Sequence, residues 1–124
     1  MHNPLAFHGE SLSLQVLRAY NVYAMDAQMI KTLQDYFATQ PVLKAWVFGS
    51  FARGEETEES DVDILFVPDR SQHFSLFTHG GMYMELRELL GREVDLVVNG
   101  TLRPYAQRTA DNDKILVYER AVKG

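Results

Sequence analysis

The chain has 124 residues, of which 46% are hydrophobic and 23% are charged, proportions usual for a single globular domain. Its 12 Lys and Arg against 17 Asp and Glu give a net charge of -5, which disfavours binding to nucleic-acid phosphates. No stretch approaches the roughly 20 apolar residues that cross a bilayer, and residues 1–24 lack the pattern of a secretory signal. With no cysteine available for disulfides, the composition favours the cytoplasm.

Helical and extended patterns alternate along the chain. Apolar residues repeat at helical spacing in some segments, and short runs rich in Val, Ile and Leu are typical of strands. In chain order we expect a helix at 25–37, a strand at 43–48, an acidic loop at 54–61, a strand at 62–67, mostly loop at 68–81, a helix at 82–90, a strand at 93–98, a short helix capped by Thr101, and a strand at 115–118. This alternation predicts an α/β fold, or α+β if the strands run in mixed directions.

The first 24 residues fit this scheme poorly, because the apolar residues of 12–23 are compatible with either a helix or a strand. Met25, followed by an aspartate, makes a natural start for the compact domain. We therefore divide the chain into an N-terminal extension at 1–24 and a domain at 25–124. The extension is interpreted as an appendage, or as an upstream misreading of the start codon.

Gly49 and Ser50 end the first expected strand. A glycine there lets a phosphate approach the backbone closely, and the serine offers a hydroxyl and can cap the helix that follows. A plain strand-to-helix turn would also explain this pair.

Three aspartates stand at the heads of expected strands. Asp61 and Asp63 share one face of a strand, about 6 to 7 Å apart along it, and such like charges are unfavourable without a cation between them. Asp95 begins the third strand in the same way, so the three carboxylates meet if these strands are neighbours. Alone, an Asp-x-Asp usually marks the start of a strand. The joint spacing of Gly-Ser, ten residues and Asp-x-Asp is rare enough to disfavour chance, and oxygen ligands suit Mg²⁺.

Simpler structural roles are expected for other polar residues. The histidines lack the spacing of metal ligands, so all four are expected on the surface or in loops: His2, His8, His73 and His79. Tyr83 and Tyr105 are expected to be half-buried packing residues. Glu93 shares a face with Asp95, and exposure to solvent at the start of a strand is its simplest interpretation.

The segment FGSFARGEETEESDVDILFV resembles the signature of the minimal nucleotidyltransferase (MNT) branch of the nucleotidyltransferase superfamily. That pattern is Gly-Ser, ten residues and Asp-x-Asp, with Ala-Arg-Gly after the serine and a Ser before the first aspartate. The matching positions in this chain are Gly49, Ser50, Ala52, Arg53, Gly54, Ser60, Asp61 and Asp63. REVDLVV resembles the segment that bears the third carboxylate, and ILVYE resembles the closing strand. Phe51 departs from the family, in which an Arg is common.

This resemblance implies a palm domain like that of DNA polymerase β, with a mixed sheet, two Mg²⁺ ions and ATP as the triphosphate. By this resemblance Asp61 and Asp63 hold the metals with the triphosphate, and Asp95 completes the metal site that activates an acceptor hydroxyl. The nucleotide-binding positions that it implies are Gly49, Ser50, Arg53 and Ser60. A surface ion pair is an equally good interpretation of Arg53.

The resemblance also implies a partner. The minimal branch is often encoded beside a helical HEPN-type toxin, and as antitoxin it adenylylates a tyrosine of that ribonuclease. One alternative is a small-molecule nucleotidyltransferase of the aminoglycoside-modifying kind, whose relatives usually carry a further helical domain. Another is a non-catalytic module, which the complete set of carboxylates disfavours. We therefore expect a cytoplasmic protein adenylyltransferase with a HEPN-type partner, and neither a membrane nor a nucleic acid as partner.

Overall fold

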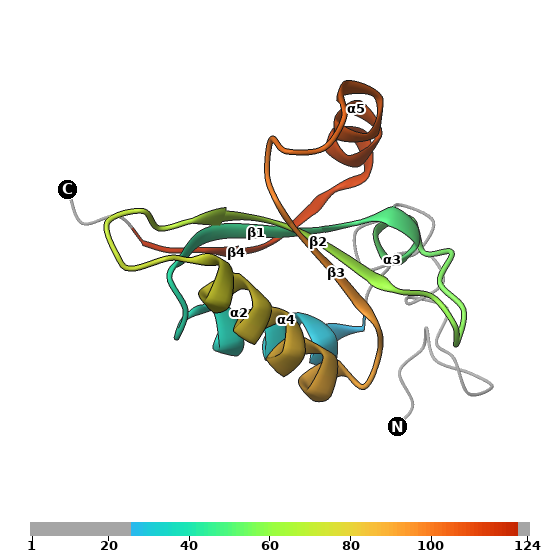
Figure 1. Ribbon diagram of the computed structural model, residues 1–124. Helices are drawn as coiled ribbons and strands as arrows, with labels where there is room; N and C mark the ends of the chain where they lie inside the picture. The colour runs from blue at the N-terminus through green and yellow to red at the C-terminus, as the bar shows by residue number, and fades with distance from the viewer. Residues whose placement is uncertain (1–25, 122–124) are drawn as a thin grey trace.

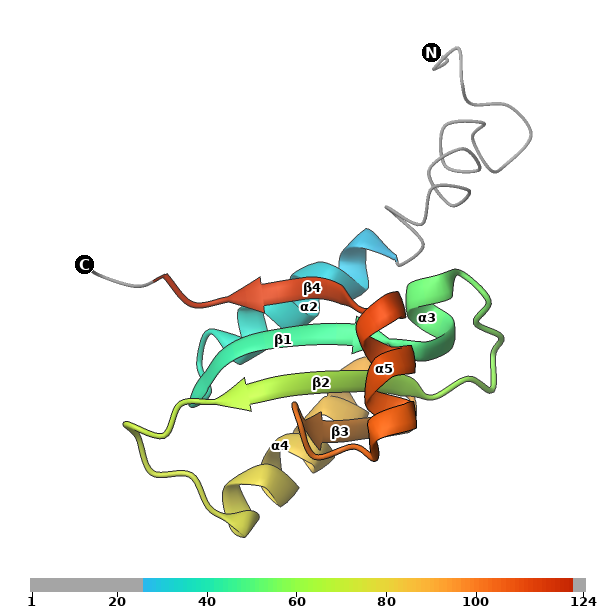
Figure 2. The ribbon, with the colours of Figure 1, turned by 90° about the horizontal axis from the view of Figure 1, so that it is seen from above.

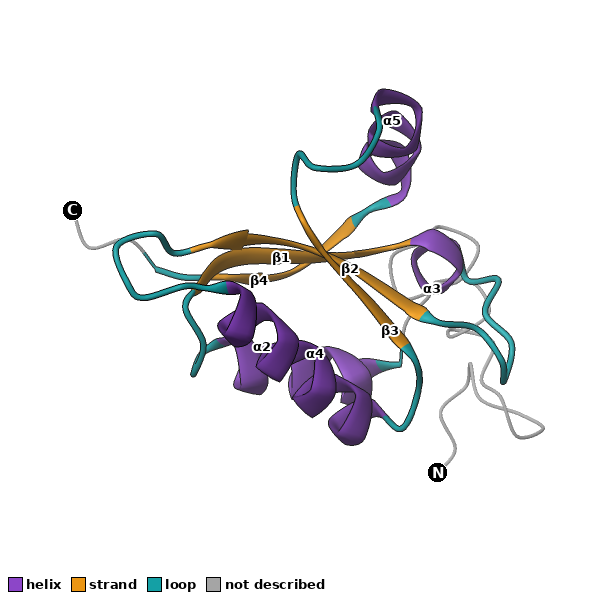
Figure 3. Cartoon of the chain, in the orientation of Figure 1, coloured by secondary structure: helices purple, strands orange, loops and turns teal. Residues whose placement is uncertain are grey.

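The computed structural model describes residues 26–121 of the chain. Its elements are α2 (Ala27–Phe37), β1 (Val42–Phe48), α3 (Gly49–Arg53), β2 (Val62–Pro68), α4 (Leu76–Leu90), β3 (Val94–Val98), α5 (Pro104–Asp113) and β4 (Ile115–Glu119). Helices and strands alternate, which confirms the predicted α/β class (Figure 3). None of the helices in this part of the chain is long and apolar enough to cross a bilayer. The extension predicted at 1–24 lies outside the described residues.

The strands form one mixed sheet in the order β3-β2-β1-β4. β1 is antiparallel to both of its neighbours, whereas β2 and β3 are parallel. The C-terminal end of β1 therefore lies at the same end of the sheet as the starts of β2 and β3 (Figure 2). This topology brings together segments that are far apart in the sequence.

Helices cover both faces of the sheet. α2 and α4 lie against one face and α5 lies over the other (Figure 1). The main core is formed between the sheet and the pair α2 and α4, and its fully buried members include Leu33, Phe37, Val47, Ile64, Phe66 and Leu86. Successive residues of a strand point to opposite faces, and β2, an inner strand, buries Ile64, Leu65 and Phe66 completely. β2 is apolar on both faces because helices cover both faces of the sheet.

α4 begins earlier than the sequence pattern predicts. Ser75 forms a capping box with Thr78, in which the Ser75 hydroxyl accepts from the Thr78 amide and the Thr78 hydroxyl accepts from the Ser75 amide. The expectation of mostly loop at 68–81 therefore holds for residues 69–75 and was wrong for residues 76–81. Gly80 and Gly81 suggested a loop, but both lie inside this helix, where a glycine costs about 1 kcal/mol relative to alanine.

α5 also differs from its prediction. Its N-cap residue is Arg103, and Thr101 instead donates its hydroxyl to the carbonyl of Val98 at 2.7 Å. Thr101 is thus not the helix cap. Tyr105 is 75% exposed, so its predicted packing role was wrong, whereas Tyr83 is half-buried as expected.

Candidate active site

The three predicted aspartates come together at one end of the sheet. Asp63 of β2 pairs in register with Asp95 of β3, and neighbouring strands lie about 5 Å apart. Asp61 immediately precedes β2 and is separated from Asp63 by one residue. Asp63 is half-buried, while the other two aspartates are exposed to solvent. The site therefore has one sheltered carboxylate with two accessible ones beside it.

Charge repulsion and burial make this arrangement unfavourable in the absence of a cation. Burial of Asp63, followed by repulsion from Asp95 and then from Asp61, raises the pKa of Asp63 to about 6, and nearby Arg53 opposes this shift. A divalent cation would favour the charged carboxylates, and oxygen donors of this kind suit Mg²⁺. The donor set fits that ion.

Among residues 26–121, however, no three His, Asp or Glu side chains are already arranged to hold a metal ion together. Mg²⁺ is commonly bound through one or two carboxylates and the phosphates of a substrate, in place of a complete protein cage. The cluster of Asp61, Asp63 and Asp95 therefore fits an ion that arrives with a nucleotide better than a permanent metal centre.

Gly49 lies directly against the sheltered carboxylate. Its φ angle is +73°, and a Cβ atom added there would lie 2.1 Å from Oδ2 of Asp63. A side chain at this position would collide with Asp63 as well as strain the backbone. In the structure the group that lies close to this backbone is the Asp63 carboxylate. The predicted approach of a phosphate to Gly49 stays a prediction.

Ser50 and Arg53 both belong to the short helix α3. Phe48 is the N-cap residue of α3 and no side chain caps the helix, so the prediction that Ser50 caps it was wrong. Arg53 donates from Nε to Glu55 and from Nη1 to Asp113, each at 2.9 Å. It thus forms surface ion pairs that connect α3 with the end of α5.

Ser60 shapes the turn that precedes Asp61. Its hydroxyl accepts a hydrogen bond from the Thr57 amide at 2.8 Å, and its own amide donates to the Thr57 carbonyl at 3.1 Å. Both contacts close the turn formed by residues 57–60. Ser60 therefore has a structural task here, beside the nucleotide-binding role that the family resemblance implies.

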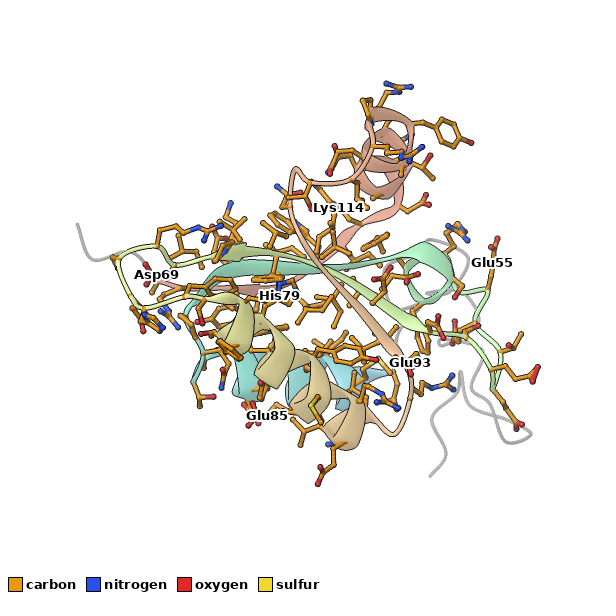
Figure 4. All side chains as sticks on the ribbon, in the orientation of Figure 1. Glu55, Asp69, His79, Glu85, Glu93 and Lys114 are labelled. Carbon is orange, nitrogen blue, oxygen red and sulfur yellow. The ribbon has the colours of Figure 1, made fainter. Side chains whose placement is uncertain are left out.

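The described histidines have no common role. His73 is exposed, whereas His79 lies between α4 and the sheet (Figure 4). A ring nitrogen of His79 is 2.8 Å from the carbonyl oxygen of Leu96, and the ring packs edge-on against Phe66. The prediction of a surface or loop position was therefore wrong for His79, a half-buried packing residue of a helix. The predictions for His2 and His8 fall outside the described residues.

Glu93 has partners of its own beside the cluster. It accepts a hydrogen bond from the Tyr83 hydroxyl and forms an ion pair with Arg87 at 3.2 Å. Its side chain remains 47% exposed, which agrees with the expected exposure at the start of a strand. These partners anchor Glu93 to α4.

Sequence reasoning missed Arg92. Its Nη1 donates to the carbonyl oxygens of Thr57, Glu58 and Ser60, at 2.9, 3.2 and 3.0 Å. Its guanidinium also stacks on Phe51, 5.0 Å from the ring centroid. These partners lie more than 30 residues away in the chain, so no local pattern could have indicated the contacts.

A mixed sheet carries clustered carboxylates and a close glycine turn at one end, and this donor set is compatible with a metal-bound phosphate. The chain belongs to the family of nucleotidyltransferase domains, whose family model matches residues 27–117. It is therefore an enzyme of the nucleotidyltransferase class, and the family resemblance seen in the sequence is confirmed.

Similar proteins agree with this family. The protein adenylyltransferase MntA of Thermococcus cleftensis is 34% identical over 87 residues, which cover 70% of this chain and 83% of MntA. A solved structure described as a candidate minimal nucleotidyltransferase is 30% identical, with a TM-score of 0.56, over 82% of this chain and 93% of the other. A crystal structure of a toxin–antitoxin complex with AMP-PNP shares the fold, with 19% identity and a TM-score of 0.57, over 75% and 72% of the two chains.

Proposed function

We propose that this chain transfers AMP from ATP, with Mg²⁺, to a tyrosine hydroxyl of a HEPN-type toxin, and thereby acts as a cytoplasmic antitoxin. The name of the Thermococcus relative, a protein adenylyltransferase, supports the choice of AMP and of a protein acceptor. The fold shared with the antitoxin-containing complex supports the choice of partner.

The observation that carries this proposal is the pairing of Asp63 with Asp95 in register on parallel strands. The Asp95 carboxylate raises the free energy of the charged form of Asp63 in the absence of a cation. A triphosphate that arrives with its metal ion would relieve this repulsion. The repulsion that destabilises the free protein would thus favour binding of the metal-bound triphosphate. A purely structural role would not explain why both residues are acidic.

Each residue then has a task in the transfer. Asp61 and Asp63 would hold the metal-bound triphosphate, and Asp95 would face the acceptor hydroxyl. The Gly49–Ser50 turn would lie along the phosphates. The bound cation supplies positive charge that offsets the charges of the carboxylates and of the leaving group. The hydroxyl oxygen forms a bond to the α-phosphorus as the bond to the bridging oxygen of pyrophosphate breaks, and the hydroxyl proton is released.

Two nucleotide-binding assignments are less direct. Arg53 would have to turn from Asp113 toward the phosphates, which its 39% exposed side chain permits. Ser60 would contact the nucleotide only if its hydroxyl, which accepts from the Thr57 amide, also donates its proton. The nucleotide-binding roles of Arg53 and Ser60 are therefore taken from the family pattern. The structure supports them only by placing both residues next to the carboxylate cluster.

The acceptor side of the site is open. β3 is an edge strand of the sheet, and Asp95 on it is exposed. A groove of about 360 Å³ runs between β3 and α4, and Leu76, Gly80, Tyr83 and Asp95 are among its lining residues. A protein can approach this edge from outside and place one side chain there, with binding energy from remote contacts positioning its hydroxyl.

The test is transfer of label from ATP that is radioactive at the α-phosphate. With Mg²⁺, we expect label on a tyrosine of the HEPN-type protein from the same organism, and far slower labelling of RNA ends or an aminoglycoside. Asp63→Asn should abolish transfer. Asp69→Asn is the matched control, because Asp69 follows the opposite end of β2 (Figure 4) and should leave transfer intact. Efficient labelling of the aminoglycoside, with the protein untouched, would overturn the proposal.

A further inference from the structure

Arg92 occupies the short connection between the end of α4 and the start of β3. One of its terminal nitrogens, Nη1, lies within hydrogen-bond distance of three carbonyl oxygens, those of Thr57, Glu58 and Ser60. Because that nitrogen carries two protons, at least one proton is shared between two carbonyls. The carbonyls of the turn at 57–60 thus converge on a single cationic group.

The contacts of Arg92 join three parts of the candidate site. Its guanidinium stacks on Phe51 in α3, the helix that Gly49 begins. Its hydrogen bonds hold the turn that ends immediately before Asp61. Its own backbone leads within three residues to Asp95. The two strands that present the carboxylates are therefore connected at their heads through one side chain.

The contacts of Arg92 place a cation beside the acidic loop at 54–61. It carries four glutamates and Asp61 within eight residues, and these like charges repel one another. The carbonyl oxygens of Thr57, Glu58 and Ser60 accept hydrogen bonds from the Arg92 guanidinium, which is a cationic donor. A cation bound to these carbonyls opposes the repulsion and gives the turn a fixed shape.

We infer that Arg92 is a positioning residue for nucleotidyl transfer, which holds the turn at 57–60 and thereby sets the place of Asp61 relative to Asp95. Arg92 touches no reacting atom in this scheme. The inference rests on the proposed roles of Asp61 and Asp95 in the transfer. A displacement of about 1 Å in such a constellation can reduce a rate by as much as about 100-fold.

The test combines amide hydrogen exchange with transfer kinetics. In Arg92→Ala, the amides of Thr57 and Ser60 should lose protection, and kcat should fall about 10- to 100-fold with a smaller change in KM for the acceptor. Arg92→Lys keeps the charge but lacks the planar guanidinium, so this variant should retain part of the amide protection and part of kcat. Arg70→Ala is the matched control, because Arg70 also stacks on an aromatic ring, that of Phe74, in the connection that follows the opposite end of β2. This control should change neither the amide protection of the turn nor kcat.

Two results would overturn the inference: a turn that stays protected in Arg92→Ala, or lost protection with an unchanged kcat. If the alanine variant does not fold, Arg92→Lys against wild type decides by the same two readouts. If wild type labels no acceptor, the proposed function fails separately. In that case the affinity for Mg²⁺-ATP is measured in place of kcat. If an Arg92 variant loses protection of the turn but keeps the wild-type affinity, the inference is overturned.

Discussion

Replacing Asp63 by asparagine should stabilise the free protein at neutral pH. Asparagine has nearly the same shape, so it preserves the packing against Gly49 while it removes the charge. Asp63 has a folded pKa of about 6, above the unfolded value of about 3.9. Between these values the folded state keeps a proton that the unfolded state has released, so Asp63 lowers stability as the pH rises from about 4 to about 6. The Asp63→Asn variant does not lose this stability as the pH rises.

The magnitude follows from the same shift. One pKa unit corresponds to about 1.4 kcal/mol, so a shift of about two units sets an upper limit of about 3 kcal/mol above pH 6. Asp63 is only half-buried, and solvent screening reduces charge interactions at such positions. We therefore expect Asp63→Asn to raise the free energy of unfolding by about 1–2 kcal/mol at pH 8 and by little at pH 4.

Urea denaturation at pH 4, 6 and 8, without metal or nucleotide, measures this difference. Asp69→Asn is a control of opposite sign, because hydrogen bonds from Ser71 and Gln72 lower the pKa of Asp69. Asp69 therefore contributes stability above its unfolded pKa that is lost as the pH falls through its folded pKa, and its substitution should destabilise at pH 8. The reasoning is refuted if Asp63→Asn is less stable than wild type at pH 8, or if its effect is the same at all three pH values.

Two further substitutions test the geometry of the site. Gly49→Ala should lower the free energy of unfolding more than Gly91→Ala, because both glycines have positive φ but only Gly49 of the two lacks space for a Cβ atom. Each variant should lose about 1–2 kcal/mol from backbone strain alone. Equal losses in urea denaturation would contradict the contact between Gly49 and Asp63. Asp95→Asn should lower kcat while it leaves most of the affinity for Mg²⁺-ATP, because an acceptor-side group acts on the chemical step; an equal loss of turnover and affinity, measured by single-turnover kinetics and calorimetry, would instead place Asp95 in the triphosphate site.

Local patterns in the sequence were sufficient to predict the strand heads and the aspartates there, and the convergence of the three carboxylates followed only if the two strands were neighbours. The apolar runs that contain Ile64 and Leu96 indicated buried strands, and an aspartate at the head of such a run stands out against its apolar surroundings. The pairing of Asp63 with Asp95 depends on the register between β2 and β3, which the sequence left open as a condition. The parallel pairing in the structure meets that condition.

Features that depend on tertiary contacts were not predictable in this way. The glycine pair in α4 concealed the first part of that helix, since local propensity favours a loop there, while the capping box at Ser75 and packing of the helix on the sheet stabilise it. His79 shows no ligand spacing, and only the fold reveals its contact with Leu96. Arg92 follows a helix-ending glycine, a position where a solvated arginine is ordinary. Its partners become visible only when the acidic loop and β3 are placed together.

The most direct measurement of the central claim is the change in melting temperature on addition of Mg²⁺-ATP. A ligand that binds only the folded protein stabilises it by mass action, by about 2.7 kcal/mol at 100 times its Kd. We predict that Mg²⁺-ATP raises the melting temperature of wild type and of Asp69→Asn alike, and that Asp63→Asn loses this rise although its free form is at least as stable. A variant Asp63→Asn that gains as much from Mg²⁺-ATP as wild type would contradict the assignment of the carboxylate cluster as the metal–nucleotide site.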